Sequence, residues 1–509
     1  MSFQSSDLTV SQLQFIQENH LATLTTLRPD GSPHVVPVGF TFDADNNIVR
    51  VITFAKSMKA RHAALGGRAV VSQVDRGRWI TFEGTVRLRT EADIVAKAVE
   101  GTITEQIPAS VLQNHDDCTF VIDELAATEL TRHKSPWLTG ANDWTPQMIK
   151  KAVIDLALKL NKTVLSLTSD DYKENSLSDL LVLKASVYDI NLQVFYMLRD
   201  SITGWPGGKP NAVIPAHPER SEPHSKKVLI FSPHPDDDII SMGGTFMRLQ
   251  DQGHDVHVAY QTSGNIAVTD EFVTRFLDFA VGFEDLFGID NKKSQEILTN
   301  ARAFLANKAT NHLDTAEIRA IKGLIRRCEA KATCRYVGIS ENNYHFMDLP
   351  FYETGMIDKK PLSEKDIEIT MELLRKIQPH QVYCAGDLAD PHGTHKVCLE
   401  VVFESMRRLK AAGDSWVKDC WVWLYKGAWQ EWDISEIEMA VPMSPDQVMK
   451  KRFGIFIHQS QKDSVPFQGT DSREFWQRAE IRNANTANLY ANLGLTKYAA
   501  MEAFVRWHY

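Results

Sequence analysis

The chain has 509 residues, a formal net charge of −9 and a pI near 6.0. This length predicts two to four domains, and the acidic balance argues against a partner bound through a nucleic-acid phosphate backbone. No apolar run reaches the roughly 20 residues of a membrane-spanning helix. The six cysteines form no C-x-x-C pair, and the first residues lack a signal-peptide pattern. We therefore expect a cytoplasmic protein with no membrane partner.

Residues 1–92 have the pattern of a small β-barrel domain. A helix is expected at 11–19, and segments rich in β-branched and aromatic residues predict strands at 21–28, 34–42, 48–54, 68–74 and 79–88. Turn sequences such as PDGSP and DRGR separate them. A short helix closed by glycine is expected at 57–67. Five antiparallel strands with one helical crossing predict a small barrel.

Residues 93–210 change to a mainly helical pattern. Helices are expected at 93–103, 148–161 and 176–200, and CTFVIDE predicts a strand at 118–124. Residues 211–226 are rich in proline, serine and charge, and we interpret them as a linker.

From residue 227 to 509 the order is strand, helix, strand. VLIFS and HDVHVAYQTS are apolar strands on either side of the helix SMGGTFMRLQDQG, which is a βαβ unit. A further helix, strand and helix are expected at 365–378, 381–387 and 395–409. The sequence predicts a Rossmann-like α/β domain with a parallel sheet, and hence a multidomain α/β chain.

Two polar motifs follow strands of this region. His234-Pro-Asp-Asp-Asp238 follows VLIF, and Asp390-Pro-His-Gly-Thr-His395 follows QVYCAGD. In parallel sheets, ligands bind at the carboxyl ends of strands, so both motifs are expected in one crevice. Two histidines and a carboxylate suit a catalytic zinc ion, and a further carboxylate is a candidate general base. The alternative for the aspartates is a solvated turn or a helix N-terminus.

The motifs PHPDDD, GGT and HGTH resemble those of the LmbE/PIG-L family of zinc-dependent N-deacetylases, over roughly residues 225 to 509. The usual family motif is HPDDE, from which Asp238 departs. The resemblance implies that His234, Asp237 and His395 bind zinc, that Asp236 is the general base, and that His392 polarises or protonates the reacting amide. The segments IRRCEA and KRFGIFIHQSQ also resemble family segments; they contain Arg326, Glu329, His458 and Gln461.

This resemblance predicts a metal-dependent amide hydrolase. It would remove the acetyl group from an N-acetylglucosamine-type amino sugar, with or without a phosphate. The implied partner is this small molecule, and the sequence leaves open whether the chain is a monomer or a homo-oligomer.

Two further resemblances leave alternatives open. The segment AVEGTITEQIPASVLQNHDDCTFVIDELAATEL is similar to the C-terminal part of glucosamine-6-phosphate deaminases. The segment contains no phosphate-binding glycine loop, so a sugar-phosphate sensor or a scaffold is an alternative to a deaminase.

Residues 8 to about 90 resemble the split-barrel family of pyridoxamine-phosphate-oxidase-like proteins, without their final strand and helix. This resemblance implies a deazaflavin coenzyme or FMN, with Lys56, Ser57 and Lys59 near its phosphate, and an oxidoreductase as the alternative function. The alternative for the two lysines is a solvated position on a short helix.

Overall fold

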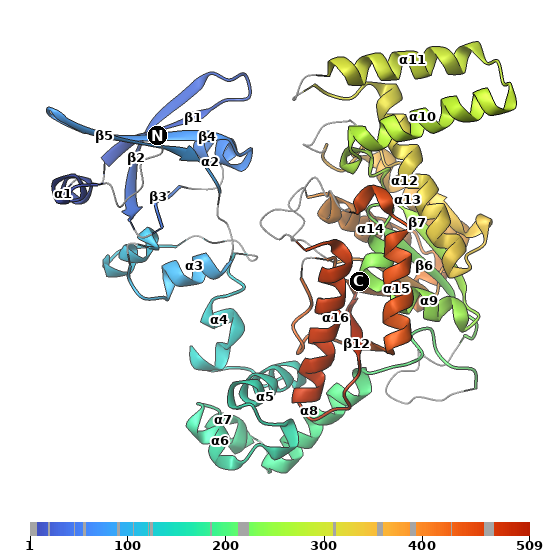
Figure 1. The fold of residues 1–509 in the computed structure, drawn as a ribbon. Coiled ribbons are helices and arrows are strands. Elements are labelled where there is room, and N and C mark those ends of the chain that lie inside the picture. Colours follow the sequence, from blue (N-terminus) through green and yellow to red (C-terminus); the bar gives the residue numbers. More distant parts are fainter. Residues whose placement is uncertain are drawn as a thin grey trace. The chain divides into compact units, whose positions relative to one another are not determined.

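The computed structural model describes residues 8–18, 21–44, 46–53, 57–88, 92–104, 106–120, 122, 126–183, 186–211, 223–308, 312–353, 360–386, 393–428, 430–462 and 473–509. The chain forms two compact units, Met1–Asp143 and Trp144–Tyr509, which are treated separately below (Figure 1). Among the described helices, none has the length and apolar character needed to cross a membrane.

The first unit is built on one antiparallel sheet. Its five strands are β1 (Leu21–Leu27), β2 (Pro33–Asp43), β3 (Ile48–Val51), β4 (Arg68–Asp75) and β5 (Arg78–Thr85), in the order β3-β2-β1-β4-β5. The helices α1 (Val10–Glu18) and α2 (Met58–Ala64) accompany the sheet. Its core includes Ile16, Leu24, Phe40 and Val71. The sheet forms a half-barrel, and the expected strands and both helices are confirmed.

The rest of the first unit has little regular structure. It contains α3 (Ala92–Val99), η2 (Pro108–Asn114), α4 (Thr131–Lys134) and η3 (Pro136–Leu138). The expected strand at 118–124 is wrong for its described part, because residues 118–120 and 122 lie in no helix or strand. A strand needs a neighbour for its backbone hydrogen bonds, and no described strand of this unit pairs with the segment.

The second unit contains a seven-stranded mixed sheet in the order β11-β12-β10-β9-β6-β7-β8. Its strands are β6 (Lys227–Ser232), β7 (Asp255–Tyr260), β8 (Tyr344–Phe346), β9 (Gln381–Ala385), β10 (Trp421–Tyr425), β11 (Met439–Met443) and β12 (Ala500–Trp507). The strands from β10 to β8 are parallel, which confirms the Rossmann-like prediction. Strand β12 runs antiparallel to both β10 and β11, so one end of the sheet departs from the all-parallel expectation.

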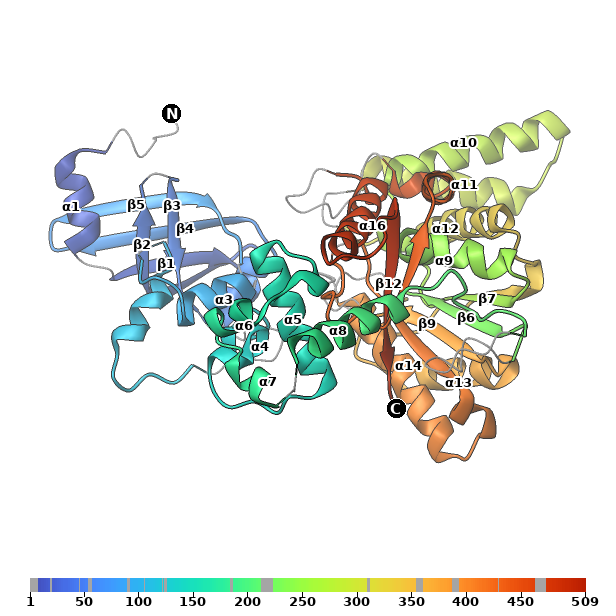
Figure 2. The same cartoon turned by 90° about the horizontal axis from the view of Figure 1, so that it is seen from below.

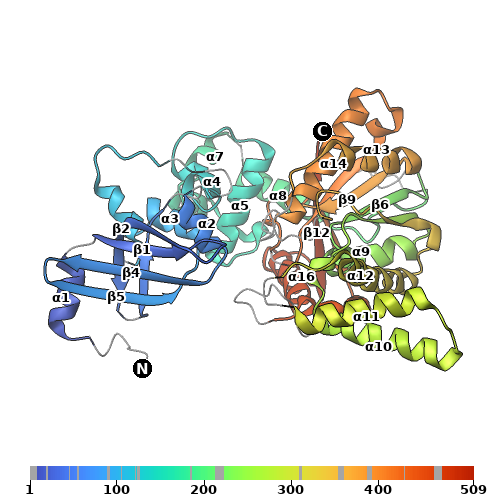
Figure 3. The same cartoon turned by 90° about the horizontal axis from the view of Figure 1, so that it is seen from above.

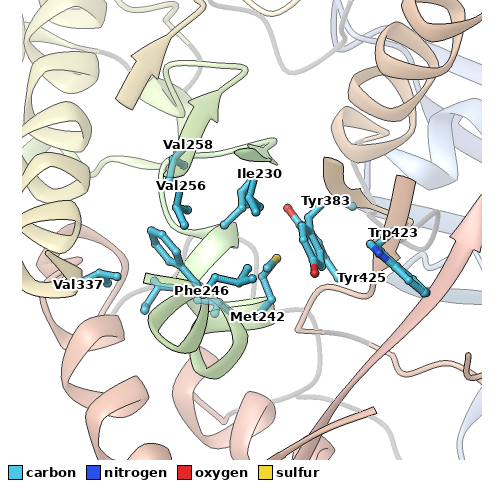
Figure 4. Close-up of a cluster of buried hydrophobic side chains, with 14 of the residues drawn as sticks. Ile230, Met242, Phe246, Val256, Val258, Val337, Tyr383, Trp423 and Tyr425 are labelled. Carbon is cyan, nitrogen blue, oxygen red and sulfur yellow. The ribbon is translucent and has the colours of Figure 1, made fainter. Parts of the chain in front are cut away.

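Helices cover both faces of this sheet (Figure 2). One face carries α9 (Asp237–Asp251), α12 (Ala316–Val337), α15 (Pro445–Phe456) and α16 (Phe475–Asn492), and the other carries α13 (Glu364–Ile377) and α14 (Thr394–Ala411). Because side chains alternate along a strand, Val228 and Ile230 of β6 join the first core, and Leu229 and Phe231 join the second. Figure 4 shows the first core, in which Phe246 and Met242 of α9 lie near Ile230.

Four helices before the linker also belong to the second unit: α5 (Pro146–Leu160), α6 (Ser169–Glu174), α7 (Ser178–Leu183) and α8 (Val187–Ser201). The single helix expected at 176–200 is therefore two helices. The buried Lys150 ammonium donates to the carbonyl of Ile437, and the amide of Thr203 donates to the carbonyl of Ala440. The segment after α8 is also held, because a Cβ on Gly207 would lie 2.2 Å from Nε2 of His254.

The helices α10 (Asp270–Phe287) and α11 (Lys292–Asn307) form a hairpin on the second unit (Figure 3). Its inner face packs through Val273, Leu277, Leu298 and Ala301. The other short 3₁₀ helices in the described part of this unit are η4 (Val164–Ser166), η6 (Asn265–Ala267), η7 (Glu341–Asn343), η8 (Ser415–Asp419) and η9 (Gln459–Gln461).

Candidate metal centre

The two sequence motifs meet at the carboxyl ends of neighbouring strands. Strands β6 and β9 are paired in parallel, and the polypeptide leaves both at the same edge of the sheet. After β6, the chain turns at residues 233–236 and enters α9 at Asp237. After β9, it enters α14 at Thr394, with Gly393 as N-cap at φ 69°. Adjacent parallel strands thus bring together side chains that are 161 positions apart in the sequence.

Three donor atoms form a nearly equilateral triangle. Asp237 Oδ2 lies 3.1 Å from His234 Nδ1 and 3.2 Å from His395 Nε2, and the two nitrogens are 3.3 Å apart. Asp237 and His395 are buried and His234 is half-buried. A tetrahedral zinc ion with bonds of about 2.0–2.2 Å places neighbouring donors about 3.3–3.6 Å apart. Two of the three distances are 0.1–0.2 Å shorter than this range and the third lies at its lower end, so a small outward shift of the side chains would let these donors hold a zinc ion.

The electrostatic setting separates Asp237 from its neighbour. Burial alone would raise the pKa of Asp237, but the charges and hydrogen bonds of His395 and His234 hold it well below its usual range. Burial raises the pKa of Asp236, although the Arg326 guanidinium opposes this shift. Arg326 Nη2 donates to Asp236 Oδ1 at 2.7 Å, and both side chains are buried. The two carboxylates thus have different partners and can serve different purposes.

The third aspartate faces away from the histidines. Asp238 accepts a hydrogen bond from the Tyr260 hydroxyl at 3.1 Å, and its backbone amide donates to Ser232 Oγ at 3.1 Å. Burial raises the pKa of Asp238 to about 7. Each of the three adjacent carboxylates therefore has its own protein partner, and these partners offset the repulsion among the aspartates.

A pocket opens beside Asp236. Its lining combines polar side chains with three aromatic rings: Asp236, His458, Gln461, Phe456, Phe475 and Trp476. His458 Nε2 lies 2.9 Å from Thr333 Oγ1, and burial holds the pKa of His458 well below its usual range, which keeps the imidazole neutral. Glu329 fixes the adjacent turn by accepting bonds from the amide and hydroxyl of Ser460. The residues in the two weaker family-like segments therefore lie at or beside this pocket.

Sequence reasoning missed the loop after β7. Gly264 has φ 63°, and a Cβ there would lie 2.9 Å from Pro235 Cδ and 3.0 Å from Arg326 Nε. Glycine at this position leaves room for Arg326 to reach Asp236. In the same loop, Ser263 Oγ donates to Glu353 Oε2 at 3.1 Å. The signal in the sequence was QTSGN at the carboxyl end of a third parallel strand, where the same strand-end argument applies.

Two of the sequence-derived site residues, His392 and Lys56, lie outside the described residues. In the first unit, Ser57 is the N-cap of α2: its Oγ accepts from the amide of Ala60 at 3.2 Å and lies 2.8 Å from Thr53 Oγ1. Lys59 is half-buried on the first turn of the same helix. The proposed phosphate contacts of these residues stay predictions.

The first unit has one histidine on α2 and another on β2 beside it. His62 Nδ1 is 3.0 Å from Thr26 Oγ1, and the ring of His62 meets the ring of His34 edge-on at 5.0 Å. These polar groups come from β1, β2 and α2, so the half-barrel gathers them on one side of its sheet.

Comparison with known families gives two matches in separate parts of the chain. Residues 229–406 match the family described as GlcNAc-PI de-N-acetylase (PIG-L), and residues 9–134 match the N-terminal family of pyridoxamine 5'-phosphate oxidase. The second match passes the boundary at residue 92 that the sequence suggested, and that boundary stays a prediction.

Several curated proteins are similar to parts of the chain. A glucosamine-6-phosphate deaminase-like protein of Bacteroides thetaiotaomicron is 51% identical over 418 residues, which are 82% of this chain and 63% of that protein. A biliverdin reductase of Mycobacterium tuberculosis that depends on a reduced deazaflavin coenzyme is 54% identical over 86 residues, which are 17% of this chain and 63% of that protein. The chain thus spans less than two thirds of both relatives.

Other similarities are shorter or more distant. A glucosamine-6-phosphate deaminase of Streptococcus thermophilus is 50% identical over 40 residues, 8% of this chain and 17% of that protein. Among solved structures, N,N'-diacetylchitobiose deacetylase from Pyrococcus horikoshii aligns with 56% of this chain and 84% of its own, at 19% identity and a TM-score of 0.35.

Proposed function

We propose that this chain, which carries a PIG-L domain in its C-terminal part and a pyridoxamine-phosphate-oxidase-like split barrel in its N-terminal part, is a zinc-dependent N-deacetylase of an amino sugar. The substrate class is an N-acetylglucosamine-type sugar, with or without a phosphate. The observation that carries the proposal is the triangle of donor atoms from His234, Asp237 and His395. The family description, which names an N-acetylglucosaminyl compound, supports the substrate class.

The three ligands would hold the ion through two imidazole nitrogens and one carboxylate oxygen. When bound, zinc would supply Lewis-acid chemistry by polarising the substrate carbonyl and acidifying water. The low pKa of Asp237 keeps this ligand ionised. Because Asp238 is engaged by Tyr260 and Ser232, it is not needed as a ligand.

Asp236 is the proposed general base. It precedes the proposed ligand Asp237 in the chain and lines the pocket, and its bond to Arg326 fixes one carboxylate oxygen. The other oxygen would accept the proton of the attacking water. By resemblance to the family, His392 would polarise or protonate the reacting amide. The aromatic rings of Phe456 and Trp476 give the pocket a surface on which a sugar ring can pack.

The test is acetate release from N-acetylglucosamine and from its 6-phosphate by chelator-treated protein to which zinc is returned. We expect zinc to restore release, and the variant His395→Ala to lose both bound zinc and activity while it stays folded. The variant His508→Ala, which changes an exposed histidine of the same unit, serves as the control. Zinc binding without release from either sugar would refute the substrate class, and a failure to bind zinc would refute the metal centre.

A second candidate function belongs to the first unit. The identity of 54% over 86 residues to a deazaflavin-dependent biliverdin reductase supports a deazaflavin coenzyme or FMN as ligand of the half-barrel. Lys56, Ser57 and Lys59 are the proposed phosphate contacts. Titration of the full chain with each cofactor, followed by cofactor fluorescence, tests this function. We expect saturable binding that the Ser57→Ala variant weakens, and no binding of either cofactor would exclude it.

A further inference from the structure

The hairpin of α10 and α11 carries apolar side chains on two faces of α10. The inner face, with Val273 and Leu277, is buried against α11 and α12. The outer face carries five large apolar side chains that are 40–77% exposed: Phe276, Phe279, Phe283, Leu286 and Phe287. Contiguous apolar surface of this kind on a helix marks an interaction site. We call these five residues the α10 seam.

The spacing of the seam indicates what kind of partner covers it. Phe276, Phe279, Phe283 and Leu286 follow one another at intervals of three, four and three residues. These are successive a and d positions of a heptad, the pattern of a helix that packs against another helix. The seam aromatics already contact one another, with ring centroids 6.2 Å apart for Phe279 and Phe283. The occupant that fits this surface is therefore a helix.

The sequence of α10 is nearly symmetric about Val281: residues at equal distances before and after it are similar in type. Ala280 corresponds to Gly282, Phe279 to Phe283, and Phe276 to Leu286. In an antiparallel helix pair, each a position packs against a d position of the other helix. A second α10 in the reversed direction would therefore set phenylalanine against phenylalanine at the centre, as a two-fold interface requires.

The surroundings of the seam also favour a second copy of the same helix. The positions that flank the two central phenylalanines are Ala280 and Gly282, which are small and uncharged, and a Cβ on Gly282 would meet no atom within 4 Å. Two of the nearby carboxylates already have partners inside the hairpin. Asp278 pairs with Arg302 at 2.5 Å, and Glu284 accepts a hydrogen bond from Ser294. Close approach of two copies would therefore bury no unpaired charge at these positions.

Area and charge set limits on the interface. With about 200 Å² for each large side chain, the seam offers roughly 600 Å² per copy and roughly 1,200 Å² in a pair. This buried area is at the lower limit for a specific interface. We therefore expect a weak dimer, whose population depends on the protein concentration. A bilayer is the less suitable occupant, because anionic lipid repels a helix with five carboxylates and one arginine: Asp270, Glu271, Asp278, Glu284, Asp285 and Arg275.

We propose that the α10 seam is a homodimer interface, in which the α10 helices of two copies of this chain pack antiparallel. The two-fold axis crosses the outer face of α10 at the level of Val281. The two hairpins would then form a four-helix arrangement. The proposal concerns assembly and does not depend on the proposed catalytic function.

The first experiment is sedimentation velocity of the full chain between about 1 and 50 μM. We expect a monomer–dimer equilibrium in this range. Phe283→Glu should shift it to monomer by at least tenfold in dissociation constant, because it sets two carboxylates against apolar surface at the centre of the seam. Ile297→Glu is the matched control: Ile297 is also exposed, but it belongs to α11, and this variant should dimerise as the unchanged chain does.

A second experiment tests the geometry without disturbing the seam. The antiparallel pairing sets position 282 of one copy beside position 282 of the other. Gly282→Cys should therefore form a covalent dimer under mild oxidation, whereas Thr299→Cys, at an exposed position of α11, should react at the background rate of the unchanged chain. A monomer at every concentration, a dimer that survives Phe283→Glu, or equal cross-linking at both positions would overturn the proposal. Binding to phosphatidylcholine vesicles by a chain that stays monomeric would also overturn it.

Discussion

Glu502 connects the far end of the chain to the helix that begins at the candidate metal centre. Helix α9 has a break at Met242, where φ is −135° and ψ is 28°. The second part of the helix therefore starts with free amide groups, and Glu502 of β12 accepts them: Gly244 N at 2.9 Å and Thr245 N at 2.6 Å. The buried Lys451 ammonium donates to the same carboxylate at 2.7 Å. A Cβ on Gly244 would lie 2.2 Å from Met443 Sδ and 3.3 Å from Glu502 Oε1, so glycine makes room for both side chains.

Replacing Glu502 by glutamine keeps the shape but removes the charge. The variant leaves the buried Lys451 ammonium without the carboxylate that it pairs with. The new amide NH₂ group would face the Gly244 and Thr245 amides, which are also donors. The loss of one partner of a buried ion pair costs about 3–5 kcal/mol. We therefore expect Glu502→Gln to destabilise the second unit by about this amount.

The double variant Glu502→Gln with Lys451→Met removes both charges. The helix amides lack a full acceptor in both variants. In place of the unpaired ammonium, the double variant leaves only a neutral group, Asn483 Oδ1, without the Lys451 donor, which costs about 1–3 kcal/mol. The double variant should therefore be more stable than Glu502→Gln alone. Because a chain of two units does not unfold in one step, we would follow hydrogen exchange of the α9 amides. If the two changes destabilise α9 additively, Lys451 and Glu502 are not coupled and the reasoning is refuted.

The same carboxylate also has a defined pH dependence. Burial would raise the pKa of Glu502, but Lys451 and the donors of Thr245 and Gly244 hold it below its usual range. Its contribution to stability is therefore present above the unfolded pKa of about 4.3. This contribution is lost as the pH falls through the lower folded value.

Two further predictions concern other buried contacts. Burial lowers the pKa of His254 to about 4. Its contribution to stability is therefore full above the unfolded pKa of about 6.5 and falls by up to about 3 kcal/mol toward pH 4. In urea unfolding, the stability of His254→Asn should depend less on pH in this range, and an unchanged pH dependence would contradict this prediction. If Asp236 is the proposed general base, Arg326→Met should lower kcat by about 100-fold, because the carboxylate loses the partner that positions it. The zinc content, measured by mass spectrometry, should not change, and Arg326→Lys should recover part of the activity. Loss of zinc would instead make Arg326 part of the proposed metal site.

The sequence predicted what depends on local pattern. The strands of the half-barrel, the βαβ unit and the meeting of the two motifs all follow from strand periodicity and from the rule that parallel strands end at one edge. The contact between Arg326 and Asp236, and that between Glu502 and α9, join residues 90 and more than 250 positions apart. No local pattern encodes these pairs, because they arise only when helices and strands pack on the sheet.

The helical segment before the linker shows a different limit. Sequence pattern indicated one helix at 176–200, and the structure has two with residue 186 between them in the described part. All the residues in that stretch are compatible with a helix, so the break must come from packing. The hydroxyl of Tyr172 donates to Asn191 at 2.7 Å, and the Asn191 amide donates to the carbonyl of Leu167. These buried bonds tie α8 to α6 and to the end of η4.

The part of the chain that supports the candidate metal centre is longer than the family match at 229–406. His458 and Trp476, which line the pocket, and Glu502, which caps the broken helix α9, all follow this segment. Lys150 and Thr203, which precede the matched segment, donate to the carbonyls of Ile437 and Ala440, beside and within the edge strand β11. Without these donors, that edge of the sheet would be open to water or to another chain. A fragment cut at the family boundaries would keep every proposed zinc ligand yet lose the contacts that hold those ligands in place. Ligand geometry of this accuracy requires a rigid supporting shell, so the smallest part of the chain expected to bind zinc runs from about residue 144 to the last strand.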